Sequence, residues 1–191
     1  MKALELYRKA QSGAHYKHIG FLAIPKNASS SMMSLFPPRG RSYKYELPEG
    51  LDLFCILRDP VKRFESAFNF LARQERQVPD ASKINEIVCD EEKLEALIMK
   101  NNFCRYHLMP QVYFTGLDPV IFERTFLISD MPLLQKWLED ELEWKKTVPT
   151  KQMPQKNKGN YESKLTKKSK KILEKLYAKD YEFIEAAGHQ L

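Results

Sequence analysis

The sequence has few cysteines and no long apolar run, and each scarcity removes a class of protein. Its three cysteines, Cys55, Cys89 and Cys104, are an odd number without the spacing of metal ligands, which argues against a disulfide framework and against zinc. No stretch approaches the roughly 18 apolar residues of a membrane-spanning helix, and the N-terminal MKALELYRKA lacks a signal-peptide core. We therefore expect a cytoplasmic protein without a membrane span or a metal, with Cys55 as a small core residue.

The residues that are present suit one globular domain. The chain has 191 residues, of which 43% are hydrophobic, enough for a single core. The net charge of +6 is unevenly spread, since residues 145–179 hold twelve lysines and only Glu162 and Glu174 as acids. Such a segment is a solvated helix face, or it attracts an anionic substrate or nucleic acid. We predict one domain over residues 1–191.

An apolar run that breaks into small hydroxyl residues lies near the N-terminus, in IGFLAIPKNASSSMMSLF at residues 19–36. Its first part, residues 19–24, reads as a strand buried on both faces, as in a parallel sheet. The segment after Pro25 offers N-cap side chains and backbone N–H groups at the start of a short helix. Such a junction with a lysine attracts phosphate, although the glycines of a P-loop are absent. An ordinary capped helix with a solvated Lys26 is the alternative.

The same pattern returns in LDLFCILRDPVKRFESAF at residues 51–68. A buried strand over residues 53–57 is followed by Arg58, and then by Asp59 and Pro60 as the N-cap and first residue of a helix. Arg58 therefore lies at the carboxyl end of a strand, where open α/β sheets bind ligands. Lys62 and Arg63 fall in the first helical turn, which disfavours cations. A nearby anion would remove that conflict.

The pair PKNASSS and RDPVKRFESAF resembles the two signature motifs of sulfotransferases that use 3′-phosphoadenosine 5′-phosphosulfate (PAPS), most closely the carbohydrate (Golgi-type, family 2) branch. Weaker similarities are His107-x-x-Pro110-Gln111 and the C-terminal segment from Leu165-Thr166 to Asp180-Tyr181. The first motif departs from the family in Asn27, and the second in Phe68. The resemblance implies an α/β fold with a central, mostly parallel sheet flanked by helices, like that of P-loop nucleotide kinases.

The resemblance also implies the activity and the residues of the site. The expected reaction moves a sulfuryl group from PAPS to a hydroxyl of a small-molecule or glycan acceptor, with a carbohydrate favoured, and leaves adenosine 3′,5′-bisphosphate. Lys26 and the motif residues Asn27, Ala28, Ser29, Ser30 and Ser31 would hold the 5′-phosphosulfate. Arg58 and Ser66 would hold the 3′-phosphate. Lys156 and Lys158 lie where a loop of the family closes over the nucleotide. No metal is required, and no oligomeric state is predicted.

A hydroxyl acceptor benefits from a general base. His107 is the first candidate, because a histidine accepts a proton near neutral pH and this one lies in a family-like segment. A histidine bonded within a loop is the alternative interpretation. His18 and Glu46 are further candidates for the base.

The rest of the chain gives coarser expectations. A helix over residues 1–18 would end in a turn at Ser12-Gly13, and residues 101–118 would form a loop over the site. Residues 145–164 would form a second loop. A last helix would begin after Thr166 and run to Gly188. We further expect a short strand at residues 41–46, a strand at 125–128, and helices over 59–77, 82–88, 90–100 and 130–142.

Two other functions compete with the sulfotransferase. A P-loop-like nucleotide kinase would also hold phosphate at a strand-to-helix turn, but it needs a glycine-rich loop and a carboxylate for Mg²⁺. A basic nucleic-acid-binding module would use residues 145–179, but it would leave Lys26 and Arg58 unexplained. We therefore regard nucleic acid as the weaker expectation.

Overall fold

The computed structural model of the protein describes residues 12–37, 41–42, 50–73, 81–148 and 164–191. They belong to two compact units. The first takes in the chain up to Arg58, Gln111–Pro154 and Glu182–Leu191, and the second takes in Asp59–Pro110 and Gln155–Tyr181. The assignment of one domain to residues 1–191 stays a prediction.

A five-stranded sheet in the order β3-β1-β2-β4-β5 forms the centre of the first unit. Strands β2, β4 and β5 pair in parallel, whereas β1 runs antiparallel to both β2 and β3. Since β3 therefore runs in the direction of β2, only β1 opposes the rest, and the predicted mostly parallel sheet is confirmed. The strands are β1 (Ser12–Tyr16), β2 (Ile19–Ala23), β3 (Arg41–Ser42), β4 (Asp52–Leu57) and β5 (Arg124–Leu127).

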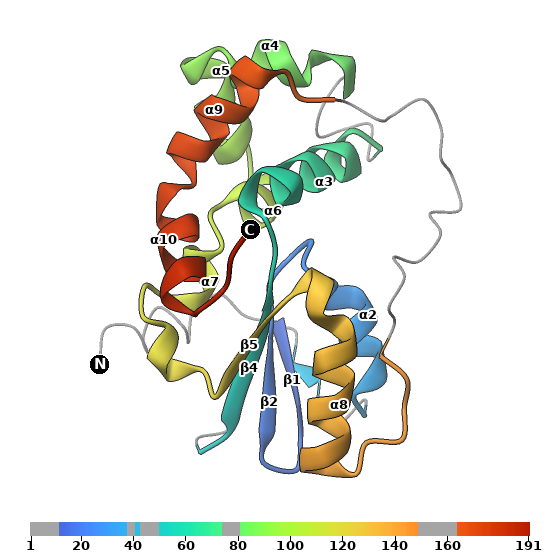
Figure 1. Ribbon diagram of the computed structural model, residues 1–191. Coiled ribbons are helices and arrows are strands. Elements are labelled where there is room, and N and C mark those ends of the chain that lie inside the picture. Colours follow the sequence, from blue (N-terminus) through green and yellow to red (C-terminus); the bar gives the residue numbers. More distant parts are fainter. Residues whose placement is uncertain (1–11, 38–40, 43–49, 74–80, 149–163) are drawn as a thin grey trace. The chain divides into compact units, whose positions relative to one another are not determined.

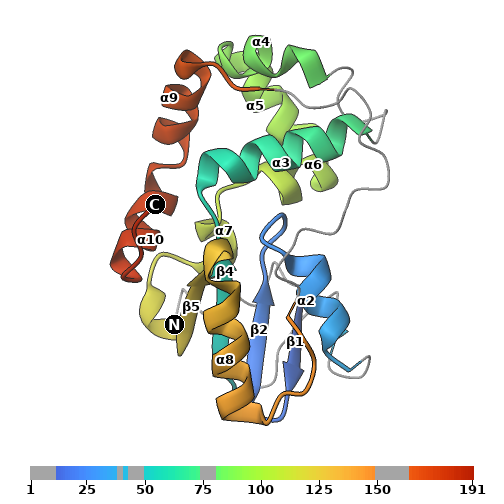
Figure 2. The same cartoon turned by 45° about the vertical axis from the view of Figure 1, so that its right-hand side comes forward.

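Two helices flank this sheet on one face. Helix α2 (Ser29–Leu35) and helix α8 (Met131–Leu142) share one apolar core with alternate residues of the strands (Figures 1 and 2). That core includes Phe21, Phe54 and Phe126 of the sheet, Met32 of α2 and Leu138 of α8. The other strand face is buried as well, as Leu22 and Cys55 show, so the unbroken apolar runs of the sequence follow from burial on both faces.

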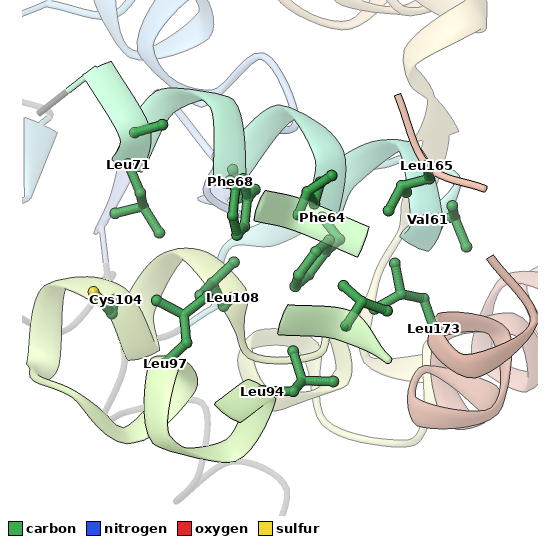
Figure 3. Close-up of a cluster of buried hydrophobic side chains, with 14 of the residues drawn as sticks. Val61, Phe64, Phe68, Leu71, Leu94, Leu97, Cys104, Leu108, Leu165 and Leu173 are labelled. Atoms are coloured by element: carbon green, nitrogen blue, oxygen red, sulfur yellow. The ribbon is translucent and has the colours of Figure 1, made fainter. Parts of the chain in front are cut away.

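The second unit is helical. Helix α3 contributes Val61, Phe64, Phe68 and Leu71, which point toward Leu97, Leu108 and Leu173 of other helices (Figure 3). These contacts explain the helical spacing of apolar residues after Asp59. The helices of this unit are α3 (Pro60–Arg73), η2 (Ala81–Lys83), α4 (Ile84–Val88), α5 (Glu91–Met99), α6 (Asn102–Leu108) and α9 (Lys167–Leu176).

Three predicted helix starts are confirmed by side-chain caps. Asp59 accepts a hydrogen bond from the Lys62 N–H at 2.8 Å. Asp90 accepts from the Lys93 N–H, and Thr166 from the Ser169 N–H. Each acceptor satisfies an N–H group that the first helical turn leaves open.

Three expectations from the sequence are wrong. Residues 12–16 form strand β1 where a helix end and turn were expected, because Ala14 is buried in the sheet core. The expected loop at residues 101–118 contains α6 and α7 (Val112–Thr115), since Asn101 caps α6 through the Cys104 N–H. The last helix is interrupted at Tyr177 and continues as α10 (Ala178–Ala186) before Gly188.

The remaining short elements of the first unit are η3 (Pro119–Ile121) and η4 (Ile128–Asp130). In the portion of the chain that the structure describes, no helix has the length and apolar character needed to cross a membrane.

Candidate functional site

The turn between β2 and α2 has an unusual backbone. Lys26 has φ 70° and Ala28 has φ 59°, the left-handed region that residues with a Cβ rarely adopt. The Asn27 N–H donates to the Ile24 carbonyl at 3.2 Å, and the Met32 N–H donates to the Ala28 carbonyl at 3.0 Å. This turn therefore reverses the chain tightly at the carboxyl end of β2.

The side chain of Asn27 points inward from this turn. Asn27 is 1% exposed, and its Nδ2 donates to the Ile56 carbonyl at 2.8 Å and to Gln111 Oε1 at 2.5 Å. Its Oδ1 is buried and has no hydrogen-bond partner among the described residues. The expected side-chain cap on α2 is wrong, because Ala28 holds the N-cap position and no described side chain caps it.

Arg58 follows β4, the strand next to β2. Its Nη1 donates to the Lys26 carbonyl at 3.0 Å, so the guanidinium lies across the turn after β2. Parallel strands end at the same edge of a sheet, which is why Lys26 and Arg58 meet although 32 residues separate them. Both residues are partly exposed.

Gln111 fixes the backbone of Arg58. The Arg58 N–H donates to Gln111 Oε1 at 3.1 Å, and Gln111 Nε2 donates to the Arg58 carbonyl at 2.8 Å. Gln111 is 1% exposed. No role was predicted for Gln111 from the sequence. The one available signal was its position at the end of the family-like segment that begins at His107.

Ser66 and His107 belong to the second unit. Ser66 lies on α3 and is partly exposed. The His107 ring lies 4.5 Å from the Phe103 ring and 5.0 Å from the Phe70 ring, centroid to centroid. Its Nδ1 is 2.9 Å from the Phe103 carbonyl oxygen. Because a carbonyl only accepts, Nδ1 carries the proton, and Nε2 of the neutral ring is the basic atom.

The Arg63 side chain of the first turn of α3 bonds to the end of another helix. Arg63 is fully buried, and its Nη1 donates at 2.6 Å to the carbonyl of Met109, the C-cap residue of α6. The C-terminal carbonyls of a helix carry partial negative charge and favour a cation. Lys62 is exposed.

The other candidates lie at the opposite strand ends from Lys26 and Arg58, or they lie outside the described residues. His18 precedes β2 and lies 3.8 Å from the Asp52 carboxylate at the start of β4, at the opposite strand ends from Lys26 and Arg58. It is therefore poorly placed as a base beside them. Lys156, Lys158 and Glu46 lie outside the described residues. Across the described ranges, no group of three or more histidine, cysteine, aspartate or glutamate residues could hold a metal ion.

Comparison with models of protein families, with curated proteins and with solved structures finds no match to this chain.

Proposed function

We propose that the protein is a PAPS-dependent sulfotransferase with the sheet architecture of P-loop nucleotide kinases. The observation that carries the proposal is the hydrogen bond from Arg58 Nη1 to the Lys26 carbonyl, which joins the turns after two adjacent parallel strands. Each turn supplies one cationic side chain at the edge where such sheets bind nucleotides. The donor carries separate anionic groups at its 5′ and 3′ positions, so two neighbouring cations match its chemistry.

Each motif residue has a proposed role. Lys26, with Asn27, Ala28, Ser29, Ser30 and Ser31, holds the 5′-phosphosulfate, and Arg58 with Ser66 holds the 3′-phosphate. Lys156 and Lys158 close over the nucleotide. Interactions that grow stronger as charge develops accelerate the reaction. Lys26 has that role, because negative charge accumulates on the leaving 5′-phosphate oxygen.

The proposed reaction is an in-line displacement at sulfur. The acceptor hydroxyl oxygen forms a bond to sulfur while the bond from sulfur to the 5′-phosphate oxygen breaks, which releases adenosine 3′,5′-bisphosphate. His107 is the proposed acceptor of the hydroxyl proton, as the family resemblance implies. Positioning of the two reactants supplies the rest of the rate enhancement, and a carbohydrate hydroxyl is the proposed acceptor. The cytoplasmic location expected from the sequence stays a prediction.

Thermal unfolding with added ligands tests the proposal. At a hundredfold excess over Kd, adenosine 3′,5′-bisphosphate should stabilise the chain by about 2.7 kcal/mol and raise Tm by roughly 5 to 10 °C. Lys26→Ala and Arg58→Ala should each remove most of that shift. Lys136→Ala, a change at an exposed lysine of α8, should leave it intact. No shift in the wild type, or a larger shift with ATP and Mg²⁺, would reject the sulfotransferase.

A row of exposed lysines favours nucleic-acid binding as a second candidate function. The lysines lie in the second unit, on α9 and its flanks, and Glu174 is the acidic residue of α9. They are Lys164, Lys167, Lys168, Lys170, Lys171, Lys175 and Lys179. Binding through them should weaken steeply with salt. Titration of a fluorescent oligonucleotide against wild type and a Lys167→Glu/Lys171→Glu variant tests it, and no binding at 50 mM salt would exclude it.

A further inference from the structure

A single buried amide connects the two turns of the candidate site. Gln111 Oε1 accepts from the Arg58 N–H and from Asn27 Nδ2, while Gln111 Nε2 donates to the Arg58 carbonyl. All three residues belong to the first unit. The two cationic turns are thus fastened to one side chain that neither motif contains.

These bonds continue the sheet beyond the ends of its strands. The backbone pairing of β2 with β4 stops at Leu22 and Cys55, and Asn27 Nδ2 then reaches the carbonyl of Ile56. The Gln111 amide holds both backbone groups of Arg58, as a neighbouring strand would. Side-chain amides therefore replace the backbone hydrogen bonds of the sheet beyond the last paired residues of β2 and β4.

These bonds fix the backbone of Arg58, and with it the point from which its side chain extends. With its N–H and carbonyl both bonded, the Arg58 backbone has little freedom to rotate, and its guanidinium is held against the Lys26 carbonyl. Asn27, bonded to the same Gln111 oxygen, restrains the turn that carries Lys26. Buried hydrogen bonds of this kind restrain the groups that they join, and removing one partner leaves another buried polar group unpaired.

We propose that Gln111 is a positioning residue, which sets the separation of Lys26 and Arg58 so that both grip one bisphosphate nucleotide. The inference rests on the proposed function and extends it to a residue outside the two motifs. Gln111 acts through the backbone of Arg58 and does not touch the nucleotide. Small errors in such placement weaken binding strongly.

Isosteric substitutions separate positioning from a purely structural role. Gln111→Met fills the same volume without hydrogen bonds, and Gln111→Asn keeps the amide but is one methylene too short to span its partners. Both should weaken binding of adenosine 3′,5′-bisphosphate at least tenfold in calorimetric titrations well below Tm. Because Gln111→Asn retains a polar amide, it keeps the test available if Gln111→Met does not fold.

The Gln111→Glu variant adds a second measurement, the pH dependence of nucleotide affinity, which a loss of stability alone would not change. The ionised carboxylate keeps the acceptor but loses the donor to the Arg58 carbonyl, and protonation restores that donor. Gln111 is buried, and burial raises the pKa of a carboxyl group. The affinity of this variant, relative to wild type at the same pH, should therefore be lowest near pH 8 and should recover at least fivefold by about pH 5.5. The wild-type reference removes the titration of the nucleotide's own phosphates.

Gln135 provides the matched control. On α8, its Nε2 donates to the Lys146 carbonyl at 3.2 Å and its Oε1 accepts from the Val148 N–H, so it also fastens a loop backbone. Gln135→Met should lower Tm while leaving nucleotide affinity within twofold of wild type.

The outcomes distinguish the two proposals. If the wild type does not bind adenosine 3′,5′-bisphosphate, the proposed function and the role of Gln111 both fail. If the wild type binds and the Gln111 variants bind equally well, the proposed function stands and the positioning role is rejected. The same rejection follows if Gln111→Glu shows the pH dependence of the wild type.

Discussion

The guanidinium of Arg58 donates a hydrogen bond to the backbone carbonyl of Lys26 across 3.0 Å. Each residue follows the end of a strand, and the strands β2 and β4 are parallel neighbours. The contact therefore holds two turns together by a side chain, at a point where the backbone ladder has stopped. An arginine suits this position, since its planar fork can serve a carbonyl and an anion in fixed directions.

Arg58→Lys should weaken binding of adenosine 3′,5′-bisphosphate at least tenfold although the charge is conserved. A lysine ammonium has no planar fork, so it cannot hold the Lys26 carbonyl and a phosphate in the same geometry. Calorimetric titration measures the change. Arg124→Lys, at an exposed arginine of β5, is the control and should bind like wild type. An unchanged Kd for Arg58→Lys would mean that only the charge matters.

Ala28→Gly should raise the free energy of unfolding by about 0.5 to 1 kcal/mol. Ala28 has φ 59°, a conformation that costs an alanine roughly 1–2 kcal/mol and a glycine almost nothing. Ala96 is exposed inside helix α5, and Ala96→Gly should lower the same quantity by about 1 kcal/mol. Urea unfolding measures both. Destabilisation by Ala28→Gly would show that the turn is not strained.

The helices and strands that were predicted correctly are those in which the apolar pattern and the residues at the ends indicate the same element. The buried run at residues 19–24, the Asp59-Pro60 start of α3 and the Thr166 cap of α9 each combine a local signal with the packing that the structure shows. Strand β1 lacked such a signal. It pairs with β2 through a two-residue turn, Lys17-His18, in which Lys17 takes φ 53° without the usual Asn-Gly.

The candidate site was predictable only where single residues carry the signal. Arg58 directly follows one apolar run, and Lys26 follows another after Pro25, so the parallel pairing of the two strands brings them together. The role of Gln111 depends on contacts across 53 and 84 residues, which no local pattern encodes. The predicted side-chain cap on α2 was wrong for a related reason. An asparagine such as Asn27 can cap a helix, but it can equally donate a hydrogen bond to a buried carbonyl.

His107→Phe should lower sulfuryl transfer at least tenfold while nucleotide affinity changes less than twofold. Phenylalanine preserves the packing against Phe70 and Phe103 but removes the basic Nε2, and a general base contributes typically 10²–10⁴ in rate. Release of adenosine 3′,5′-bisphosphate from PAPS with a desulfated glycosaminoglycan measures transfer. The control His18→Phe should leave the rate unchanged. Equal rates in both variants would exclude His107 as the base.

Cys89 should be the fast-reacting thiol of the native chain. It is exposed, whereas Cys55 and Cys104 are buried. Burial raises the pKa of the Cys55 thiol and that of the Cys104 thiol above their usual range, so both hold less of the reactive thiolate. Mass spectrometry after brief iodoacetamide treatment at pH 8 should find one modified cysteine, and none in Cys89→Ser. Rapid labelling of Cys55 would contradict the buried position of β4.

Tyr177→Phe should lower the free energy of unfolding at pH 7 by about 1–3 kcal/mol. The Tyr177 hydroxyl donates to the Leu108 carbonyl at 2.6 Å inside the second unit, and its loss leaves that buried carbonyl without this donor. Tyr181→Phe is the control. Tyr181 is only partly buried, so this change should lower the free energy of unfolding by less. Urea unfolding monitored by circular dichroism measures each variant.

The cost of Tyr177→Phe should also shrink in alkaline solution. Burial raises the pKa of Tyr177 above its ordinary value of 10.0, so the hydroxyl stays neutral in the fold after it has ionised in the unfolded chain. The folded state then holds the proton that the unfolded state has lost. The stability that Tyr177 contributes is therefore complete below pH 10 and falls as the pH rises further. A difference between wild type and Tyr177→Phe that stays constant from pH 8 to 11 would show that Tyr177 ionises equally in both states.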